Sequence, residues 1–162
     1  PRVNILNPGP GVGGHCIAVD PWFLVSQFGE KASFIQSVRK TNLLKTDWCI
    51  NKILGEINVL KSQFKQVNVA LMGLAYKPDV DDIRESPSLL IYEKLKKIDN
   101  INLILVEPNI KSSISIDLTP FHEGFETADI VVWLVKHSIF MNRDNFKNDP
   151  VILDFCGVSQ LS

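Results

Sequence analysis

The chain has 162 residues, of which 45% are hydrophobic and 22% charged, with nine glycines and nine prolines. This composition is typical of a globular domain, not of a disordered or collagen-like chain, and the length predicts about one domain that folds without disulfides or metal. Seventeen basic against 18 acidic residues give a net charge of −1, which indicates neither a nucleic-acid partner nor binding to an anionic membrane.

The start of the chain and the cysteines indicate what kind of globular protein this is. The chain begins at Pro1 with no Met and no apolar leader, so we expect it to be part of a longer protein. Its apolar runs are far shorter than a membrane span. The three cysteines, Cys16, Cys49 and Cys156, do not form a disulfide framework, and no metal-ligand spacing is present. We expect a cytoplasmic protein with free thiols and no metal, in which Cys49 and Cys156 are buried.

Residues 1–22 are rich in Pro and Gly and predict a shaped loop instead of a helix or strand. Within them, residues 9–14 (GPGVGG) satisfy the G-x-G-x-x-G pattern of dinucleotide-binding turns. That fingerprint has to close a strand and open a helix. Here Asn7-Pro8 interrupts an incoming strand and Asp20-Pro21 follows too soon for the first helix. We therefore do not interpret residues 9–14 as a dinucleotide site.

The loop ends in Cys16, which follows four glycines within six residues. Glycines let the backbone approach a ligand closely, so this thiol is a candidate nucleophile toward a carbonyl carbon. Asp20, four residues later, is a candidate base or water-orienting group. We do not assume that the adjacent His15 pairs with Cys16. The alternative is that Cys16 is an ordinary small apolar residue.

Residues 30–65 contain no Pro and one Gly, and their apolar residues recur at helical spacing. This pattern predicts one long helix or two abutting helices, with Ser33 as a candidate N-cap. Apolar side chains lie on more than one side of this helix. We therefore expect it to connect domains or to form a dimer interface.

Residues 66–162 alternate short apolar runs with helical stretches. We predict strands at 67–74, 101–106, 128–135 and 151–155, and a helix that follows an N-cap at Ser86 and runs to Asn100. This alternation predicts βαβ units and a parallel sheet with helices outside. Residues 109–127 are polar and weakly patterned, and they predict no clear element.

The turn after the first of these strands, residues 75–85, carries Lys77 and Arg84. Ligands of such folds bind at the carboxyl ends of the strands, and the helix N-terminus that follows favours anions. A phosphate-bearing ligand fits this arrangement. The alternative is that both cations pair with the acidic residues of the same turn, and the spacing leaves the two interpretations open.

Two segments resemble the signatures of the UDP-glucose/GDP-mannose dehydrogenase family. Residues 8–22 (PGPGVGGHCIAVDPW) resemble its active-site loop, and residues 73–87 (GLAYKPDVDDIRESP) resemble the start of its nucleotide-sugar-binding domain. UDP-glucose dehydrogenases typically have GGSCFPKD where this chain has GGHCIAVD, and the His15 form is similar to enzymes of N-acetyl-hexosamines. The resemblance therefore implies UDP-N-acetyl-mannosamine as substrate, with UDP-N-acetylglucosamine or UDP-glucose as alternatives.

The resemblance also implies an organisation. Residues 1–29 correspond to the active-site loop segment, 30–65 to a central connecting helix that builds a homodimer, and 66–162 to a Rossmann-like, parallel-sheet UDP-sugar-binding domain of the α/β class. Family members carry an N-terminal NAD domain that this chain lacks. The isolated chain is therefore expected to be inactive, and in isolation a non-catalytic UDP-sugar-binding and dimerisation module is the alternative. A thiol redox module ranks last, because no resolving cysteine is nearby.

The family's chemistry implies a role for each matching residue. Its members oxidise the C6 alcohol of a nucleotide sugar to a carboxylate with two NAD per turnover, through a thiohemiacetal and a thioester on the cysteine, here Cys16. Asp20 matches the aspartate that helps to activate water, and Arg84 matches an arginine near the NAD pyrophosphate. Implied contacts to the UDP-sugar are Arg2, Asn4, Gly9, Gly11, Gly13, Gly14, His15, Tyr76 and Lys77.

Overall fold

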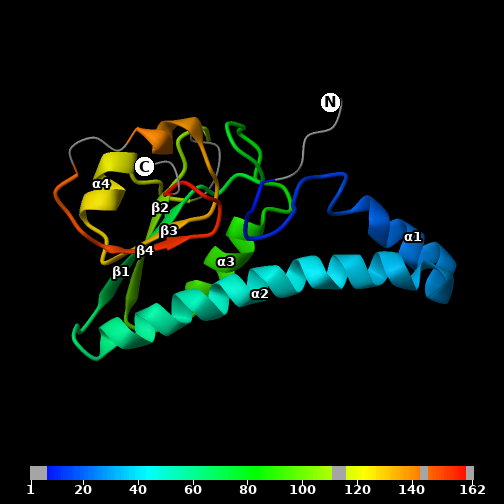
Figure 1. Ribbon diagram of the computed structural model, residues 1–162, viewed down its shortest axis with the longest axis horizontal. Helices are drawn as coiled ribbons and strands as arrows, with labels where there is room; N and C mark the ends of the chain where they lie inside the picture. Colours follow the sequence, from blue (N-terminus) through cyan, green and yellow to red (C-terminus); the bar gives the residue numbers. More distant parts are fainter. Residues whose placement is uncertain (1–6, 111–115, 143–145, 160–162) are drawn as a thin grey trace.

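The computed structural model describes residues 7–110, 116–142 and 146–159 (Figure 1). Arg2 and Asn4, two of the predicted substrate contacts, lie outside these residues. The elements in chain order are α1 (Asp20–Phe28), the 3-10 helix η1 (Gly29–Ala32), α2 (Ser33–Lys61), β1 (Val67–Met72), α3 (Pro87–Leu95), β2 (Ile101–Val106), α4 (Phe121–Glu126), β3 (Ile130–Trp133), the 3-10 helix η2 (Ser138–Met141) and β4 (Val151–Asp154).

The four strands form one parallel sheet in the order β2-β1-β3-β4, which confirms the predicted α/β class. Met72 pairs with Val106 on one side and with Trp133 on the other, and Trp133 pairs with Asp154. The last residues of all four strands therefore lie in one row. The loops that follow them leave the sheet at a single edge, which is where ligands bind in such folds.

Both faces of the sheet are covered, as expected for buried parallel strands. Figure 1 shows α2 and α3 on one side and α4 on the other. The side chains of β1 divide accordingly: Leu71 belongs to the core under α2 and α3, and Met72 belongs to the core under α4. An apolar run without polar alternation is therefore the pattern that this strand needs.

The predicted long helix is confirmed as α2, whose 29 residues span about 44 Å. Its second half packs on the sheet through residues that include Ile53 and Ile57, both fully buried. Its first half reaches beyond the sheet and contacts α1 (Figure 1). None of the described helices is long and apolar enough to cross a membrane.

The predicted N-cap at Ser33 is wrong. An N-cap residue has extended backbone, whereas Ser33 is already helical with φ −56° and ψ −36°. The 3-10 helix η1 leads directly into α2, and Ala32 occupies the cap position without a side-chain hydrogen bond. The second predicted cap is confirmed, because the Ser86 hydroxyl accepts a hydrogen bond from the Ser88 amide and Pro87 begins α3.

Several boundaries differ from the prediction. The strands β1, β3 and β4 are shorter than the predicted 67–74, 128–135 and 151–155, and α2 is shorter than the predicted 30–65. α1 begins at Asp20, within the segment predicted as loop, because Pro21 is tolerated in the first turn of a helix and the Cys16 carbonyl accepts the Asp20 amide at 2.8 Å. α3 ends at Leu95, well before Asn100, whose φ of 60° is not helical. α4 lies in the unassigned segment 109–127, because a helix of six residues is too short to show periodicity.

Candidate active site

A cavity of about 780 Å³ lies between the glycine-rich loop and the carboxyl edge of the sheet. It is lined by residues 7–17 of the loop, residues 75–78 after β1, Pro87 and Ser88 of α3, residues 134–136 after β3, Ser138 and Met141 of η2, and Cys156 after β4. The cavity thus joins the two segments that carry the sequence motifs. Of the predicted contacts, Gly9, Gly11, Gly13, Gly14, His15, Tyr76 and Lys77 all line it.

Side chains of α2 hold the loop in place. The buried Thr46 hydroxyl donates to the Pro10 carbonyl at 2.9 Å. One turn earlier, the Asn42 side chain exchanges two hydrogen bonds with the Val12 backbone, at 2.8 and 3.1 Å. A loop with so many glycines carries little packing of its own, so these bonds to a rigid helix fix its path.

Two of the glycines allow the loop to approach the turn after β1. A Cβ at Gly13 would lie 2.3 Å from the Glu85 carbonyl oxygen. Gly14 has φ +92°, and a Cβ there would lie 2.9 Å from the Tyr76 ring. The Gly14 amide donates to the Arg84 carbonyl at 3.2 Å. Gly13 is required because the two backbones touch, and Gly14 because of its positive φ and the adjacent Tyr76 ring.

Cys16 lines the cavity and is exposed, whereas the other two cysteines are buried as predicted. Burial raises the pKa of Cys49 to about 11 and that of Cys156 to about 12. The reactive form of a cysteine is the thiolate, so the exposed thiol is the candidate nucleophile. Asp20 lies one helical turn away and is exposed, but it does not line the cavity.

Lys77 and Arg84, the two cations of the turn after β1, differ in their ion pairing. Arg84 pairs with Asp82 through its Nε and Nη2 atoms, at 3.0 and 2.6 Å from the carboxylate oxygens, and the hydrogen bonds from Arg84 lower the pKa of Asp82 to about 2. For Arg84, pairing within the turn is therefore confirmed. Lys77 lines the cavity, and no carboxylate of the described residues forms an ion pair with it. Its ammonium group is available to an anion.

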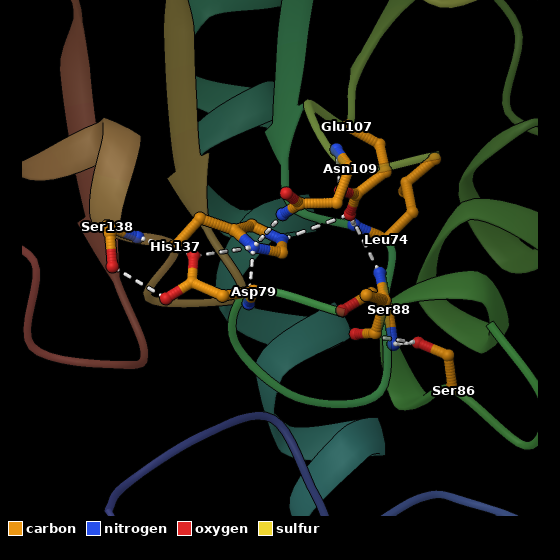
Figure 2. Close-up of polar contacts among 9 residues, drawn as sticks. Leu74, Asp79, Ser86, Ser88, Glu107, Asn109, His137 and Ser138 are labelled. Carbon is orange, nitrogen blue, oxygen red and sulfur yellow. Dashed lines mark hydrogen bonds and ion pairs between the residues drawn. The ribbon is translucent and has the colours of Figure 1, made fainter. Parts of the chain in front are cut away.

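A polar cluster that was not predicted from the sequence lies behind the cavity (Figure 2). The Glu107 carboxylate, which follows β2, accepts the amides of Leu74 and Ala75 at 2.7 and 2.9 Å and lies 3.0 Å from the His137 ring. Burial alone would raise the pKa of Glu107, but hydrogen bonds from His137 and from the Asn109 and Leu74 amides outweigh it and keep this pKa below its ordinary value. One available signal was that Glu107 directly follows one predicted strand and His137 lies two residues after another strand of the same parallel sheet.

Lys136, which follows β3 and lines the cavity together with Lys77, was not predicted from the sequence either. Two lysines from different loops thus line one cavity. No group of three or more His, Cys, Asp or Glu side chains within the described segments is arranged to hold a metal ion.

Comparison with known proteins identifies the family. Residues 70–160 match the UDP binding domain of the UDP-glucose/GDP-mannose dehydrogenase family, and residues 1–43 match the central domain of the same family. The chain belongs to the UDP-glucose/GDP-mannose dehydrogenase family. The resemblance of the two motifs is thereby confirmed, and the cavity of this dehydrogenase-family chain lies where its two matched regions meet.

Individual members of the UDP-glucose/GDP-mannose dehydrogenase family are similar over almost the whole chain. The UDP-N-acetyl-D-mannosamine dehydrogenase of Escherichia coli (strain K12) is 40% identical over 94% of this chain and 39% of its own length. The NDP-N-acetyl-D-galactosaminuronic acid dehydrogenase of Ralstonia solanacearum is 39% identical over 98% of this chain and 38% of its own. The solved UDP-D-ManNAc dehydrogenase of Pyrococcus horikoshii aligns with TM-score 0.81 and 25% identity over 100% of this chain and 39% of that one. The chain thus spans about two fifths of the length of these relatives.

Proposed function

We propose that the chain is the substrate-binding and nucleophile-carrying part of an NAD-dependent UDP-sugar 6-dehydrogenase, with UDP-N-acetyl-mannosamine as substrate. One observation carries this proposal: Cys16 and Lys77 line the same cavity, although 61 positions separate them in the sequence. A volume of about 780 Å³ is that of a typical small-molecule site. The names of the two relatives at 39–40% identity support an N-acetyl-hexosamine over glucose.

The charges of the cavity support a nucleotide diphosphate. Lys77 and Lys136 bring two cations to it from the ends of β1 and β3, and a diphosphate is the part of a UDP-sugar that needs them. In this arrangement the glycine-rich loop contacts the sugar through its backbone, and the sugar C6 carbon lies at Cys16. UDP-N-acetylglucosamine and UDP-glucose are the alternatives for the same site.

The chemistry that we propose for this chain centres on the Cys16 sulfur. At the aldehyde stage the thiolate forms a C–S bond to C6, and the carbonyl oxygen takes up a proton to give a thiohemiacetal. At the thioester stage a water oxygen attacks C6 and the C–S bond breaks, which releases the carboxylate and restores the thiol. The family resemblance assigns the proton of that water to Asp20, which lies outside the cavity but one turn from Cys16. NAD, when bound, accepts the two hydrides that this four-electron oxidation requires.

The described residues fit NAD only in part. Arg84 offers an exposed guanidinium, but Asp82 already pairs with it. Residues 9–14 are held by α2 and by the turn after β1, and no described strand leads into them, so they do not form a dinucleotide turn. We propose that a longer parent protein binds NAD mainly through other residues, and that this chain alone binds UDP-sugar without oxidising it.

Two measurements test the proposed function. Calorimetry of the 162-residue chain should detect binding of UDP and of UDP-N-acetyl-mannosamine, and absence of both would overturn the UDP site. The parent protein should form two NADH per uronate, faster with UDP-N-acetyl-mannosamine than with UDP-N-acetylglucosamine or UDP-glucose. Cys16→Ser should bind substrate but form no uronate, whereas the control Cys49→Ala keeps activity. Undiminished uronate formation by Cys16→Ser would reject the nucleophile.

We also propose a homodimer built on α2. Large apolar side chains are exposed along α1 and the first half of α2, including Phe23 (68% exposed), Phe34 (78%) and Leu44 (64%). An exposed apolar surface of this kind marks an interaction site. A second copy of the same helix is an occupant with the matching apolar surface, because a two-fold interface uses the same patch on both subunits.

A further inference from the structure

The buried His137 ring joins three loops at the carboxyl edge of the sheet (Figure 2). It follows β3, has no exposed surface and packs edge-on against Phe140, with 5.3 Å between the ring centroids. Its two nitrogens contact different partners. Nε2 lies 3.0 Å from the Glu107 carboxylate, which follows β2, and Nδ1 lies 3.0 Å from the Asp79 amide nitrogen, in the turn after β1.

The partners of the ring determine where its proton lies. The backbone amide of Asp79 is a donor and cannot accept, so Nδ1 receives its hydrogen and carries no proton itself. The Asn109 side-chain nitrogen lies 2.8 Å from the same atom, so the two donors share its single lone pair. The neutral ring therefore has its proton on Nε2, which donates to Glu107. Glu107 also accepts the Leu74, Ala75 and Asn109 amides, a set of donors that a carboxylate satisfies.

Asp79, the partner of Nδ1, has a backbone conformation that needs support. Its φ is +58°, in the left-handed region that few non-glycine residues occupy. His137 holds its amide, and its carboxylate accepts the Ser138 amide at 2.9 Å and the Ser138 hydroxyl at 2.6 Å. The carboxylate, 3.7 Å from Nδ1, is thus engaged by Ser138. His137 and Ser138 thus hold Asp79 from two sides, and we call these contacts the Asp79 clamp. Without an acceptor at Nδ1, the Asp79 amide loses its hydrogen bond to the buried ring, and only the contacts with Ser138 remain.

Lys77 lies two residues before Asp79 in the same turn, and the Tyr76 amide closes that turn on the Asp82 carbonyl at 3.0 Å. The backbone at Asp79 therefore sets where Lys77 enters the cavity. We propose that His137 is a positioning residue for ligand binding, which acts through its Nδ1 on the Asp79 amide to place Lys77 toward the phosphates of the ligand. This inference rests on the proposed function for the identity of the ligand.

Two substitutions separate the two nitrogens of the ring. In His137→Asn the side-chain oxygen lies near the former Nδ1 position and can still accept the Asp79 amide, but the donor to Glu107 is lost. In His137→Gln the amide lies near the former Nε2 position, so the donor is kept and the acceptor is lost. The exposed His122 of α4, which does not line the cavity, provides the matched control His122→Gln.

The proposal predicts an asymmetry between the variants of the 162-residue chain. His137→Gln should weaken UDP binding about tenfold in calorimetry, since it leaves a buried amide without an acceptor, whereas His137→Asn should weaken it by about threefold at most. In parallel, amide hydrogen exchange in residues 75–85 should accelerate about tenfold in His137→Gln, with β1 unchanged. His122→Gln should match the wild type in both measurements.

The outcomes separate a failure of the positioning role of His137 from a failure of the proposed function. Equal losses in the Asn and Gln variants, or faster exchange in every element alike, would mean that His137 only stabilises the fold and would overturn the proposal. A wild-type chain that does not bind UDP would overturn the proposed function, while the exchange of residues 75–85 would still test the clamp. Nitrogen-15 spectra of the wild-type histidines need no variant. A ring protonated on Nδ1 at neutral pH would contradict the proposal, and one protonated only on Nε2 supports it.

Discussion

Gly13 lies in contact with the backbone of Glu85, with room for a hydrogen atom and for nothing larger. A Cβ at Gly13 would lie 2.3 Å from the Glu85 carbonyl oxygen and 2.9 Å from Pro87. Glu85 itself has φ +51°, in the small left-handed region, so a large shift of its peptide would take it into sterically forbidden conformations. The glycine-rich loop and the turn after β1 therefore fit together only when residue 13 has no side chain.

Gly13→Ala should separate the loop from the turn. We expect a loss of about 1–3 kcal/mol in the free energy of unfolding, measured in urea, because the added methyl overlaps backbone atoms. UDP binding should weaken at least about tenfold. Gly55→Ala is the control: no atom lies within 4 Å of a Cβ there, so the variant should keep its affinity and gain about 1 kcal/mol from helix propensity. A fully stable Gly13→Ala variant would contradict the contact.

The three thiols should react at very different rates. Cys16 is exposed, whereas burial keeps the pKa of Cys49 and of Cys156 well above the ordinary value. At pH 8, a thiol reagent followed by mass spectrometry should modify one cysteine quickly and the other two only on unfolding. Cys16→Ser should remove the fast reaction, and UDP-N-acetyl-mannosamine should slow it in the wild type. Rapid modification of two thiols would show that a buried cysteine is accessible.

Acidification should destabilise the protein partly through Glu107. Its pKa in the folded state lies below the ordinary 4.5, so its contribution to stability is complete above about pH 4.5 and is lost as the pH falls through the lowered value. Glu107→Gln should cost about 2 kcal/mol at pH 7 and should lose less stability between about pH 5 and 3.

The matched control for Glu107 is Glu93→Gln, which removes an exposed ion pair with Lys96 and should cost under about 1 kcal/mol. Urea unfolding across this pH range measures both variants. If the stability of Glu107→Gln fell with pH as steeply as that of the wild type, the lowered pKa of Glu107 would be refuted.

The proposed dimer predicts a dependence on the exposed face of α2. Leu44→Lys places a charge among exposed apolar side chains and should shift the chain from dimer to monomer in analytical ultracentrifugation. Leu90→Lys changes an exposed leucine on α3 (46% exposed), and this control should leave the assembly unchanged. A stable dimer has a dissociation constant below about 10 µM. A wild-type chain that is monomeric at or above this concentration would therefore overturn the proposal.

Local signals were sufficient for much of the fold. The run 101–106 predicted β2 with its exact bounds, because buried parallel strands are continuously apolar. Ser86 and Pro87 predicted the start of α3, since a hydroxyl cap and a proline in the first turn act within a few residues. The short helix α4 was missed because six residues show no periodicity, and α1 was missed because its Asp-Pro start also reads as a loop.

The sequence alone determined the class of fold, the long helix, the family resemblance and the two motif segments that line much of the cavity, because these depend on composition, periodicity and short motifs. Only the tertiary structure decided which side chains contact one another. It paired Arg84 with Asp82, left Lys77 facing the cavity, and brought Glu107 and His137 together across 30 positions of sequence. The physical reason is that parallel pairing aligns the ends of distant strands at one edge. That register follows from the packing of the whole sheet and not from any local pattern.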